Sequence, residues 1–320
     1  MNHYNTPHHK QKIIAEALKL GFNKVGFAKA QAIDSMNENH LREWIDSGME
    51  GEMSYMRNNF DKRIDPTKLV EGCQTVIVLA MNYYPQVKQE AEIPQISMYA
   101  YGKDYHDTIR ERLKSLLNYI DTEITPCTGR GFTDSAPILE RYWAQKAGVG
   151  FIGKNNMLIT PNSGSFFFLA ALLVDIELTP DAPMSPKCGN CNRCLEACPT
   201  KAITSPRQLD SRKCISYLTI EYKGDIPQDI KPYINNRLYG CDLCQTCCPW
   251  NRFATPNTID EFQPNDEILQ LDKEKLSRLT KDDFSRIFKG SAVKRTKYEG
   301  LIRNFNAISC YADDESEQLL

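Results

Sequence analysis

Two runs of closely spaced cysteines are the residues of this chain with the clearest chemical meaning. They read Cys188-x2-Cys191-x2-Cys194-x3-Cys198-Pro199 and Cys241-x2-Cys244-x2-Cys247-Cys248-Pro249. Spacers of two residues let successive thiolates converge on one iron-sulfur cluster, and in bacterial ferredoxins the cysteine before the proline ligates the other cluster. Zinc also binds C-x2-C pairs, but the spacing and C-P ending of the first run favour iron and sulfur. The cysteines therefore predict two [4Fe-4S] clusters and electron transfer.

Treating the runs as two copies of one pattern divides their thiolates between the clusters. Cluster one takes three cysteines of the first run and the last of the second, namely Cys188, Cys191, Cys194 and Cys248. Cluster two takes the first two cysteines of the second run and the exchanged one of the first, namely Cys241, Cys244 and Cys198. Its fourth ligand stays open at this point. Symmetry selects Cys247, whereas Cys214 lies between the runs, and spacing alone does not decide. Three isolated cysteines, Cys73, Cys127 and Cys310, are typical of small buried apolar side chains.

Composition indicates that the rest of the chain is an ordinary globular protein. It has 320 residues, of which 41% are hydrophobic and 25% charged, and a formal net charge of -2. A small ferredoxin module accounts for only part of this length, so we expect a second domain with its own core. Residues 1–10 contain no apolar signal core and no twin arginine, and no segment reaches membrane-spanning length. Because thiolate ligands require reduced cysteines, the sequence predicts a cytosolic protein.

Periodicity places the elements that must position any site. The predicted helices in the first 180 residues cover 10–20, 41–45, 53–57, 109–120 and 136–147. The predicted strands cover 25–28, 75–80 and 166–174. This alternation predicts an α/β or α+β domain up to about residue 180. A proline-rich linker at 179–186 leads into the cluster module, and the helices predicted after it cover 266–288 and 292–308, with a frayed acidic tail at 313–317.

No familiar cofactor fingerprint marks the first 180 residues. There is no G-x-G-x-x-G after a strand and no Walker loop. The glycine-rich stretch 148–155 follows a predicted helix and enters an asparagine-rich segment. It suits a loop pressed against a flat ligand, and it suits equally a helix C-cap followed by a turn.

Five motifs in one order resemble the epoxyqueuosine reductases, which complete the tRNA wobble nucleoside queuosine. They are residues 101–106, 134–141, 148–155, 214–221 and 241–251, within a resemblance that runs from about Gly21 to Arg303. The resemblance implies an α+β fold with a nitroreductase-like cobalamin-binding domain at 1–180. A two-cluster bacterial ferredoxin-like domain at 181–255 and a short helical C-terminal segment at 256–320 would follow. The implied activity is reduction of epoxyqueuosine in tRNA, with cobalamin and two [4Fe-4S] clusters as cofactors.

The resemblance also implies roles for single residues. Cys214 becomes the fourth ligand of cluster two and Cys247 a bystander, because members of the family usually have no cysteine at the position of Cys247. Asp134 becomes the proton donor, which requires that burial beside the corrin raise the pKa of its carboxyl group. By sequence alone, Asp134 fits equally well as the cap of the helix predicted from residue 136.

Further residues are expected around the cofactor and the nucleoside. The implied corrin contacts are Arg57, Asp134, Asn155, Leu158, Leu169, Ser216 and Asp242. The expected lining of the substrate pocket is Asp104, Tyr105, His106, Arg141 and Trp143. Residues 104–107 begin like the D-x-H-x-x-G signature of proteins that ligate cobalt through histidine, but the glycine is missing. Lower-axial ligation by His106 is therefore not expected.

A tRNA substrate should leave an electrostatic footprint, because phosphate contacts provide most of the non-specific affinity. The net charge of the chain shows no such footprint. A local group of cations could form one, namely Lys223, Lys294, Arg295, Lys297 and Arg303. A basic helix face is also commonly only solvated. Many members of the family continue into C-terminal helical repeats that help to hold tRNA, so in a chain ending at Leu320 we expect the anticodon-arm contacts to be fewer or differently placed.

Two alternatives accompany this prediction. A corrinoid reductive dehalogenase would share the cofactors, but the twin arginine is missing and the 134–137 segment is present. A pure electron carrier would bind no corrin. For the main prediction we expect a small electron-donor protein of ferredoxin or flavodoxin type as partner, no membrane association and a monomer.

Overall fold

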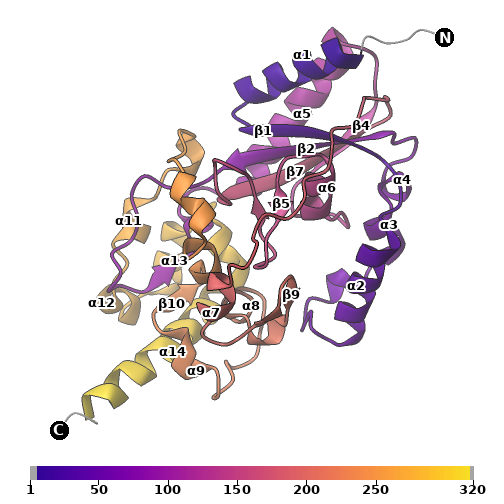
Figure 1. Ribbon diagram of the computed structural model, residues 1–320. Helices are drawn as coiled ribbons and strands as arrows, with labels where there is room; N and C mark the ends of the chain where they lie inside the picture. The colour runs from indigo at the N-terminus through magenta and orange to yellow at the C-terminus, as the bar shows by residue number, and fades with distance from the viewer. Residues whose placement is uncertain (1–5, 318–320) are drawn as a thin grey trace.

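The computed structural model describes residues 6–317, with side chains described for residues 7–308. A four-stranded antiparallel sheet forms the centre of the first half of the chain (Figure 1). Its strands in spatial order are β1 (Lys24–Lys29), β2 (Thr75–Asn82), β7 (Phe167–Val174) and β4 (Gly129–Phe132). The strands predicted at 25–28, 75–80 and 166–174 are confirmed. Strand β4 was missed because its sequence, Gly-Arg-Gly-Phe, carries almost no apolar signal.

Helices cover both faces of this sheet, which explains why β2 is apolar along its whole length. Ile77 and Leu79 of β2 belong to a hydrophobic cluster with residues of α1 (Thr6–Lys19) and α5 (Tyr105–Glu123). Val76 and Val78 point to the opposite face and belong to a second cluster with α6 (Glu140–Lys146). An antiparallel sheet with helices on its faces is an α+β arrangement, as predicted.

The cluster module consists of short elements. They are α7 (Arg193–Glu196), β8 (Ile203–Ser205), β9 (Gln208–Leu209), α8 (Ile215–Ile220), α9 (Lys231–Ile234), β10 (Arg237–Tyr239) and α10 (Leu243–Thr246). The cysteine runs enclose α7 and α10, and these two helices contact each other. The two runs are therefore brought together in space although about fifty residues separate them.

The C-terminal segment differs from its prediction in how the helices are divided. Residues 266–288 form three short helices, α11 (Asp266–Leu269), α12 (Lys273–Ser277) and α13 (Lys281–Ile287). Each begins at a polar residue whose side chain accepts a backbone hydrogen bond, namely Asn265, Asp272 and Thr280. Residues 292–308 form a 3-10 turn and then α14 (Lys297–Glu317). Because α14 continues to Glu317, the acidic residues 313–317 are helical and the frayed tail predicted there is wrong.

The remaining elements connect these parts. They are α2 (Ser35–Asp46), α3 (Phe60–Ile64), α4 (Pro66–Leu69), β3 (Gln95–Ile96), β5 (Phe151–Ile152) and β6 (Leu158–Ile159), with 3-10 turns at Ser54–Met56, Met98–Ala100, Ser211–Lys213, Pro249–Phe253 and Asp260–Phe262. The predicted helix at 53–57 is therefore a 3-10 turn. The predicted helix at 136–147 begins only at Glu140, and residues 134–139 form a loop.

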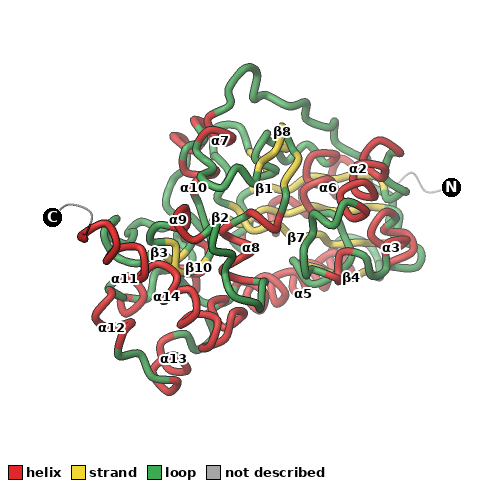
Figure 2. The backbone as a smooth tube through the Cα atoms, turned by 90° about the horizontal axis from the view of Figure 1, so that it is seen from below, coloured by secondary structure: helices red, strands yellow, loops and turns green. Residues whose placement is uncertain are grey.

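One hydrophobic cluster crosses the segment boundaries predicted at residues 180 and 255. It contains Ile13, Leu218 and Leu301 together, one from each predicted segment. Strand β3 of the first segment pairs in parallel with β10 of the cluster module. Figure 2 shows α11, α12 and α13 gathered at the end of the molecule opposite the N-terminus. Among residues 6–317, no helix combines the length and apolar character that a membrane crossing requires.

Candidate functional site

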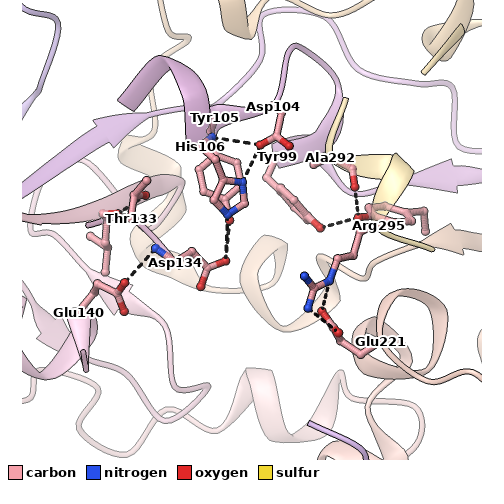
Figure 3. Close-up of polar contacts among 12 residues, drawn as sticks. Tyr99, Asp104, Tyr105, His106, Thr133, Asp134, Glu140, Glu221, Ala292 and Arg295 are labelled. Carbon is pink, nitrogen blue, oxygen red and sulfur yellow. Dashed lines mark hydrogen bonds and ion pairs between the residues drawn. The ribbon is translucent and has the colours of Figure 1, made fainter. Parts of the chain in front are cut away.

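Asp134 lies in the loop between β4 and α6, with its side chain 71% exposed. Its Oδ2 accepts a hydrogen bond from the Tyr105 hydroxyl at 2.6 Å, and its backbone N–H donates to Oε1 of Glu140 at 3.0 Å (Figure 3). The loop holds Asp134 at φ +50°, a conformation that aspartate tolerates better than most residues. The helix-cap interpretation of Asp134 is wrong, because α6 begins six residues later and no side chain caps it. The carboxyl group is free to face a ligand.

The first turn of α5 presents three polar residues to this carboxyl group. Asp104 caps the helix by accepting a hydrogen bond from the backbone N–H of His106 at 3.1 Å. The same Asp104 oxygen lies 2.6 Å from Nδ1 of His106, and Nε2 of His106 lies 4.0 Å from Oδ2 of Asp134. The imidazole stacks on Tyr105, which in turn stacks on Phe168, with centroid distances of 4.1 Å in both pairs. Stacking and the cap together fix where the imidazole points.

Electrostatics separates the groups around Asp134 into those that titrate near neutral pH and those that do not. Burial, helped by the charge of Asp134, raises the pKa of Glu140 to about 7. Burial is also the main reason that the pKa of Tyr105 lies well above its ordinary value, so this hydroxyl stays a neutral donor. Burial alone would lower the pKa of His106, but the hydrogen bond and charge of Asp104, with the charge of Asp134, raise it.

An ion pair from two other parts of the chain lies on the opposite side of the site from Asp134 (Figure 3). Arg295, in the 3-10 turn before α14, donates two hydrogen bonds of 3.0 and 2.9 Å to the carboxylate of Glu221, which follows α8. The hydrogen bond to Glu221 raises the pKa of Arg295, and the charges of Tyr55 and Asp134 add to this rise. Burial first, and then the charges of Glu221 and Asp134, raise the pKa of Tyr55 to about 12. Three segments of the chain therefore meet around one site.

Most of the cations predicted to contact nucleic acid are exposed, but one of them is hydrogen-bonded within the protein. Lys223, Lys294 and Lys297 are exposed like Arg295. Burial lowers the pKa of Lys223, and the charges of Arg295, Arg303 and Lys297 lower it further, so the group lies close together. The prediction that Arg303 contacts tRNA needs correction. Its guanidinium donates to the carbonyls of Leu218, Tyr222 and Gly224 and to the side chain of Asn304, so it is a structural clamp rather than an open phosphate ligand.

The two predicted pocket residues on α6 lie in different environments, one exposed and one buried. Arg141 is exposed and donates to the carbonyl of Asn156 at 2.6 Å, which leaves its other donors facing solvent. Trp143 is only 2% exposed and lies in the second hydrophobic cluster, so its placement as a pocket-lining residue is corrected to a core residue. Its indole N–H has no hydrogen-bond partner.

Some of the predicted corrin contacts lie on segments next to Asp134 or Glu221, and others contact the second cysteine run. Arg57 follows the 3-10 turn that carries Tyr55, and it donates to Glu50 at 2.5 Å and to the carbonyl of Ile45 at 2.8 Å. Leu169 lies on β7, where its carbonyl accepts from the hydroxyl of Thr133, the neighbour of Asp134. Ser216 lies in the first turn of α8, directly after Cys214 and a few residues before Glu221.

Three further residues connect the glycine-rich loop and β3 with the second cysteine run. Asn155 donates to the carbonyl of Cys244 at 2.8 Å, and Leu158 is buried in β6 of the same hairpin. Asp242 accepts from the backbone N–H of Met98 at 2.9 Å, and burial raises the pKa of its carboxyl group. Gly148 has a φ of +68° at the end of α6, so the C-cap interpretation holds for the start of this loop.

The residues around Asp134 come from separate segments of the chain. Asp134 and the Arg295–Glu221 pair lie on opposite sides of the site (Figure 3), and the charges of Asp134 and Glu221 both act on Tyr55. Cys214 is the N-cap residue of α8 and Glu221 is its C-cap residue. Helix α8 therefore joins the side of the site opposite Asp134 to a predicted ligand of cluster two.

The thiols of cluster one surround a pocket of about 250 Å³. It is lined by the four cysteines assigned to that cluster, together with the basic side chains of Lys154, Lys187, Arg193 and Arg252 and the indole of Trp250. In the part of the chain with described side chains, no three His, Cys, Asp or Glu groups come close enough to bind a single metal ion. A cubane cluster does not require this, because each of its four thiolates binds a separate iron atom.

The thiols assigned to cluster two also gather, and Cys214 is among them. Burial raises the pKa of the Cys244 thiol, and repulsion from the charges of Cys214, Cys241 and Cys198 adds to the rise, with a smaller contribution from Cys247. The strongest thiol neighbour of Cys247 is instead Cys248, followed by Cys191, both assigned to cluster one. These neighbours support Cys214 over Cys247 as the fourth ligand of cluster two.

Sequence reasoning missed three groups at the site, namely Tyr55, Glu140 and Glu221. Glu140 and Glu221 lie inside the 134–141 and 214–221 motifs, which was the available signal. Tyr55 had no signal beyond its position two residues before Arg57.

Comparison with known proteins gives one consistent family. A family model described as epoxyqueuosine reductase QueG, DUF1730, matches residues 63–135, and one described as a 4Fe-4S double cluster binding domain matches residues 187–251. The epoxyqueuosine reductase of Cellulophaga algicola is 47% identical over 298 residues, which cover 93% of this chain and 97% of that protein.

Solved structures agree. The crystal structure of an epoxyqueuosine reductase with an epoxyqueuosine-modified tRNA-Tyr stem loop has a TM-score of 0.86 at 30% identity, over 95% of this chain and 81% of that one. The Bacillus subtilis enzyme, solved with the catalytic loop of an aspartate swung out of the active site, has the same TM-score and identity over 98% of this chain and 84% of its own. With an identity of 47% over nearly the whole length of both proteins, this chain belongs to the epoxyqueuosine reductase family.

Proposed function

We propose that this protein reduces epoxyqueuosine to queuosine at the wobble position of tRNA. Converting an epoxide to an alkene consumes two electrons and two protons and releases water. The observation that carries the proposal is the position of Asp134, an exposed carboxyl group that accepts a hydrogen bond from Tyr105 and lies opposite Glu221, the C-cap residue of the helix whose N-cap is Cys214. The site thus offers an acid on one side and an electron source on the other.

We propose that cobalamin is held by the remaining predicted corrin contacts. They are Arg57, Asn155, Leu158, Leu169, Ser216 and Asp242. When bound in its cobalt(I) state, cobalamin supplies a strong nucleophile at low potential, which is the part of the chemistry that protein side chains cannot provide. The chain's own residues orient the nucleoside, exclude water and supply protons.

Electrons would enter at cluster one and leave from cluster two. The cysteines of cluster one line an open pocket with a basic rim, whereas Cys241 and Cys244 of cluster two are more deeply buried, and burial raises the pKa of both thiols. A small acidic electron-donor protein of ferredoxin or flavodoxin type suits the basic rim by charge complementarity. Because the cluster ligands must be reduced thiolates, we propose that the enzyme acts in the cytosol, and that it acts as a monomer.

Asp134 would deliver protons to the epoxide oxygen. A carboxylic acid gives up protons efficiently near neutral pH when its pKa is raised, and covering it with an apolar ligand has this effect. The 71% exposed side chain would be covered by the corrin and the nucleoside together. The Tyr105 hydroxyl keeps Oδ2 in place while this happens.

The tRNA would approach from the side of Arg295. The exposed cations Lys223, Lys294 and Lys297 surround this residue, and phosphate contacts from such a group provide affinity without reading sequence. An anticodon nucleotide is single-stranded and can be extruded into the pocket without breaking a base pair. Arg141, exposed at the start of α6, is a further candidate for the ribose or a phosphate.

One experiment tests the proposal directly. The protein is loaded with both clusters and cobalamin under anaerobic conditions, supplied with a strong chemical reductant and incubated with tRNA that contains epoxyqueuosine. Nucleoside analysis should show queuosine. Asp134→Asn should bind cobalamin, as judged from the absorption spectrum, and produce no queuosine. Absence of queuosine with the fully loaded wild-type protein would contradict the proposal, and a protein that binds no corrin at all would identify an electron carrier.

A further inference from the structure

His106 occupies a position that helix capping does not explain. The cap of α5 requires only Asp104 and the backbone N–H of His106. The imidazole nevertheless makes a second contact with the same carboxylate, at 2.6 Å through Nδ1. This contact turns Nε2 toward Asp134, which it approaches to 4.0 Å (Figure 3). Two carboxylates from different elements therefore face the two nitrogens of one imidazole.

The proposed reaction needs this arrangement because one carboxyl group cannot supply two protons. The epoxide C–O bonds break, two electrons from the donor protein enter through the clusters, and the oxygen leaves as water after gaining two protons. Asp134 can give the first proton and must then be protonated again while the nucleoside covers it. The second proton has to come from a neighbouring group of the protein.

Three ionisable groups lie next to Asp134, and two of them are poor sources. Tyr105 donates a hydrogen bond to Oδ2, but its raised pKa means that it keeps its proton. Glu140 accepts from the backbone N–H of Asp134 and touches the loop rather than the carboxyl group. His106 faces the same Oδ2 with its side chain 29% exposed, and although burial lowers its pKa, the hydrogen bond and charge of Asp104 raise it overall.

We propose that His106, held by Asp104, returns a proton to Asp134 within each turnover. The proton moves from Nε2 of the imidazolium to Oδ2 of the Asp134 carboxylate, and the neutral imidazole that remains keeps its Nδ1–H on Asp104. His106 then regains a proton from solvent when the product leaves and Asp134 is again exposed. His106 and Asp104 are positioning residues here, since they act on the substrate only through Asp134. This inference rests on the proposed function.

The charges that face His106 set the pH range in which it can act. Asp104 and Asp134 favour the imidazolium, while Arg110, one turn along α5, and burial oppose it. On the opposite side of the site, the positive charge of Arg295 is paired with Glu221. Activity should therefore fall as pH rises through the pKa of His106, and weakening either carboxylate should move this fall to lower pH.

The test compares Asp104→Asn with Asp107→Asn. Asparagine at 104 can still accept the Nδ1–H but has no charge, whereas Asp107 is an exposed acid on the same turn that pairs with Arg110. Two quantities are measured on cluster-loaded protein, the NMR titration of the His106 ring and the pH dependence of single-turnover queuosine formation under strong chemical reductant. Because the chain has 5 histidines, the spectrum of His106→Gln assigns the signal.

We expect Asp104→Asn to move both the ring titration and the alkaline fall in rate to lower pH by a similar amount, with tRNA affinity unchanged. Asp107→Asn should leave both in place. His106→Gln should slow turnover on the order of 100-fold, the usual size of a lost proton-transfer step. A ring titration that moves while the rate profile stays would overturn the relay, and so would a rate profile that moves in Glu140→Gln but not in Asp104→Asn.

If the proposed function itself is wrong, the same experiments give a different set of results. In that case wild-type protein and all variants form no queuosine, and the relay falls with it, although the ring titration still reports the contact between His106 and Asp104.

Discussion

Arg295 and Glu221 form an ion pair with two hydrogen bonds of 3.0 and 2.9 Å, and the pair faces Asp134 from the opposite side of the site (Figure 3). Arg295 belongs to the C-terminal segment and Glu221 to the cluster module. The segment that follows the second cysteine run therefore contributes a residue to the candidate site.

Arg295→Gln should weaken tRNA binding at this site. If Arg295 contacts one phosphate, its loss should reduce the slope of log affinity against log salt concentration by about 1. The measurement is a binding titration with tRNA at several salt concentrations. Arg278→Gln provides the matched control, since Arg278 is an exposed arginine of the same segment that pairs with Glu274. An unchanged slope in Arg295→Gln would remove Arg295 as a phosphate ligand.

Cys214→Ser should lose about half of the iron of the reconstituted protein, because it removes one of four ligands from cluster two. Cys247→Ser should keep both clusters. The measurement is the ratio of iron to protein, with the absorption spectrum as a second readout. Iron loss in Cys247→Ser with full iron in Cys214→Ser would reverse the ligand assignment.

Glu140→Gln should make the protein more stable than wild type above pH 4.5, by an amount that grows until about pH 7 and then stays constant. The pKa of Glu140 is raised to about 7 in the folded protein from a reference value of 4.5. The folded state therefore holds this proton more tightly than the unfolded state, and stability falls as pH rises between these two values. Glutamine is neutral throughout, keeps an acceptor oxygen for the Asp134 N–H, and avoids this loss.

We expect Glu140→Gln to raise the thermal midpoint relative to wild type at pH 8 by a few degrees, equivalent to about 1–3 kcal/mol, and to match wild type at pH 4.5. The measurement is anaerobic thermal unfolding of cluster-loaded protein at both pH values. Equal midpoints for the two proteins at pH 8 would mean that Glu140 is ionised there without cost.

Asn304→Ala should destabilise the contact between α14 and the cluster module. The Asn304 side chain is 0% exposed and donates to the carbonyls of Thr219 and Leu238 at 2.8 and 2.9 Å. Removing the amide leaves both buried carbonyls without this donor, which should cost about 2–4 kcal/mol. Asn118→Ala, at an exposed position of α5, is the control in the same denaturation experiment. Similar stabilities of the two variants would show that the Asn304 bonds contribute little.

Local patterns in the sequence determined the elements whose signal is carried by neighbouring residues. The spacing of the cysteines predicted two clusters because thiolates two residues apart converge without help from the rest of the chain. The apolar runs of β2 and β7 predicted buried strands, and the stripe formed by Ile109, Leu113, Leu116 and Ile120 predicted α5. Resemblance over nearly the whole chain added the family.

Only the tertiary structure decided which distant residues meet. Arg295 and Arg303 are alike in sequence, yet one faces Asp134 beside Glu221, while the other is surrounded by carbonyl groups more than seventy residues away. Trp143 could not be assigned to the core before the packing of α6 on the sheet was known. A side chain's type fixes what it can bind, but its partners depend on contacts between segments, and no local periodicity encodes them.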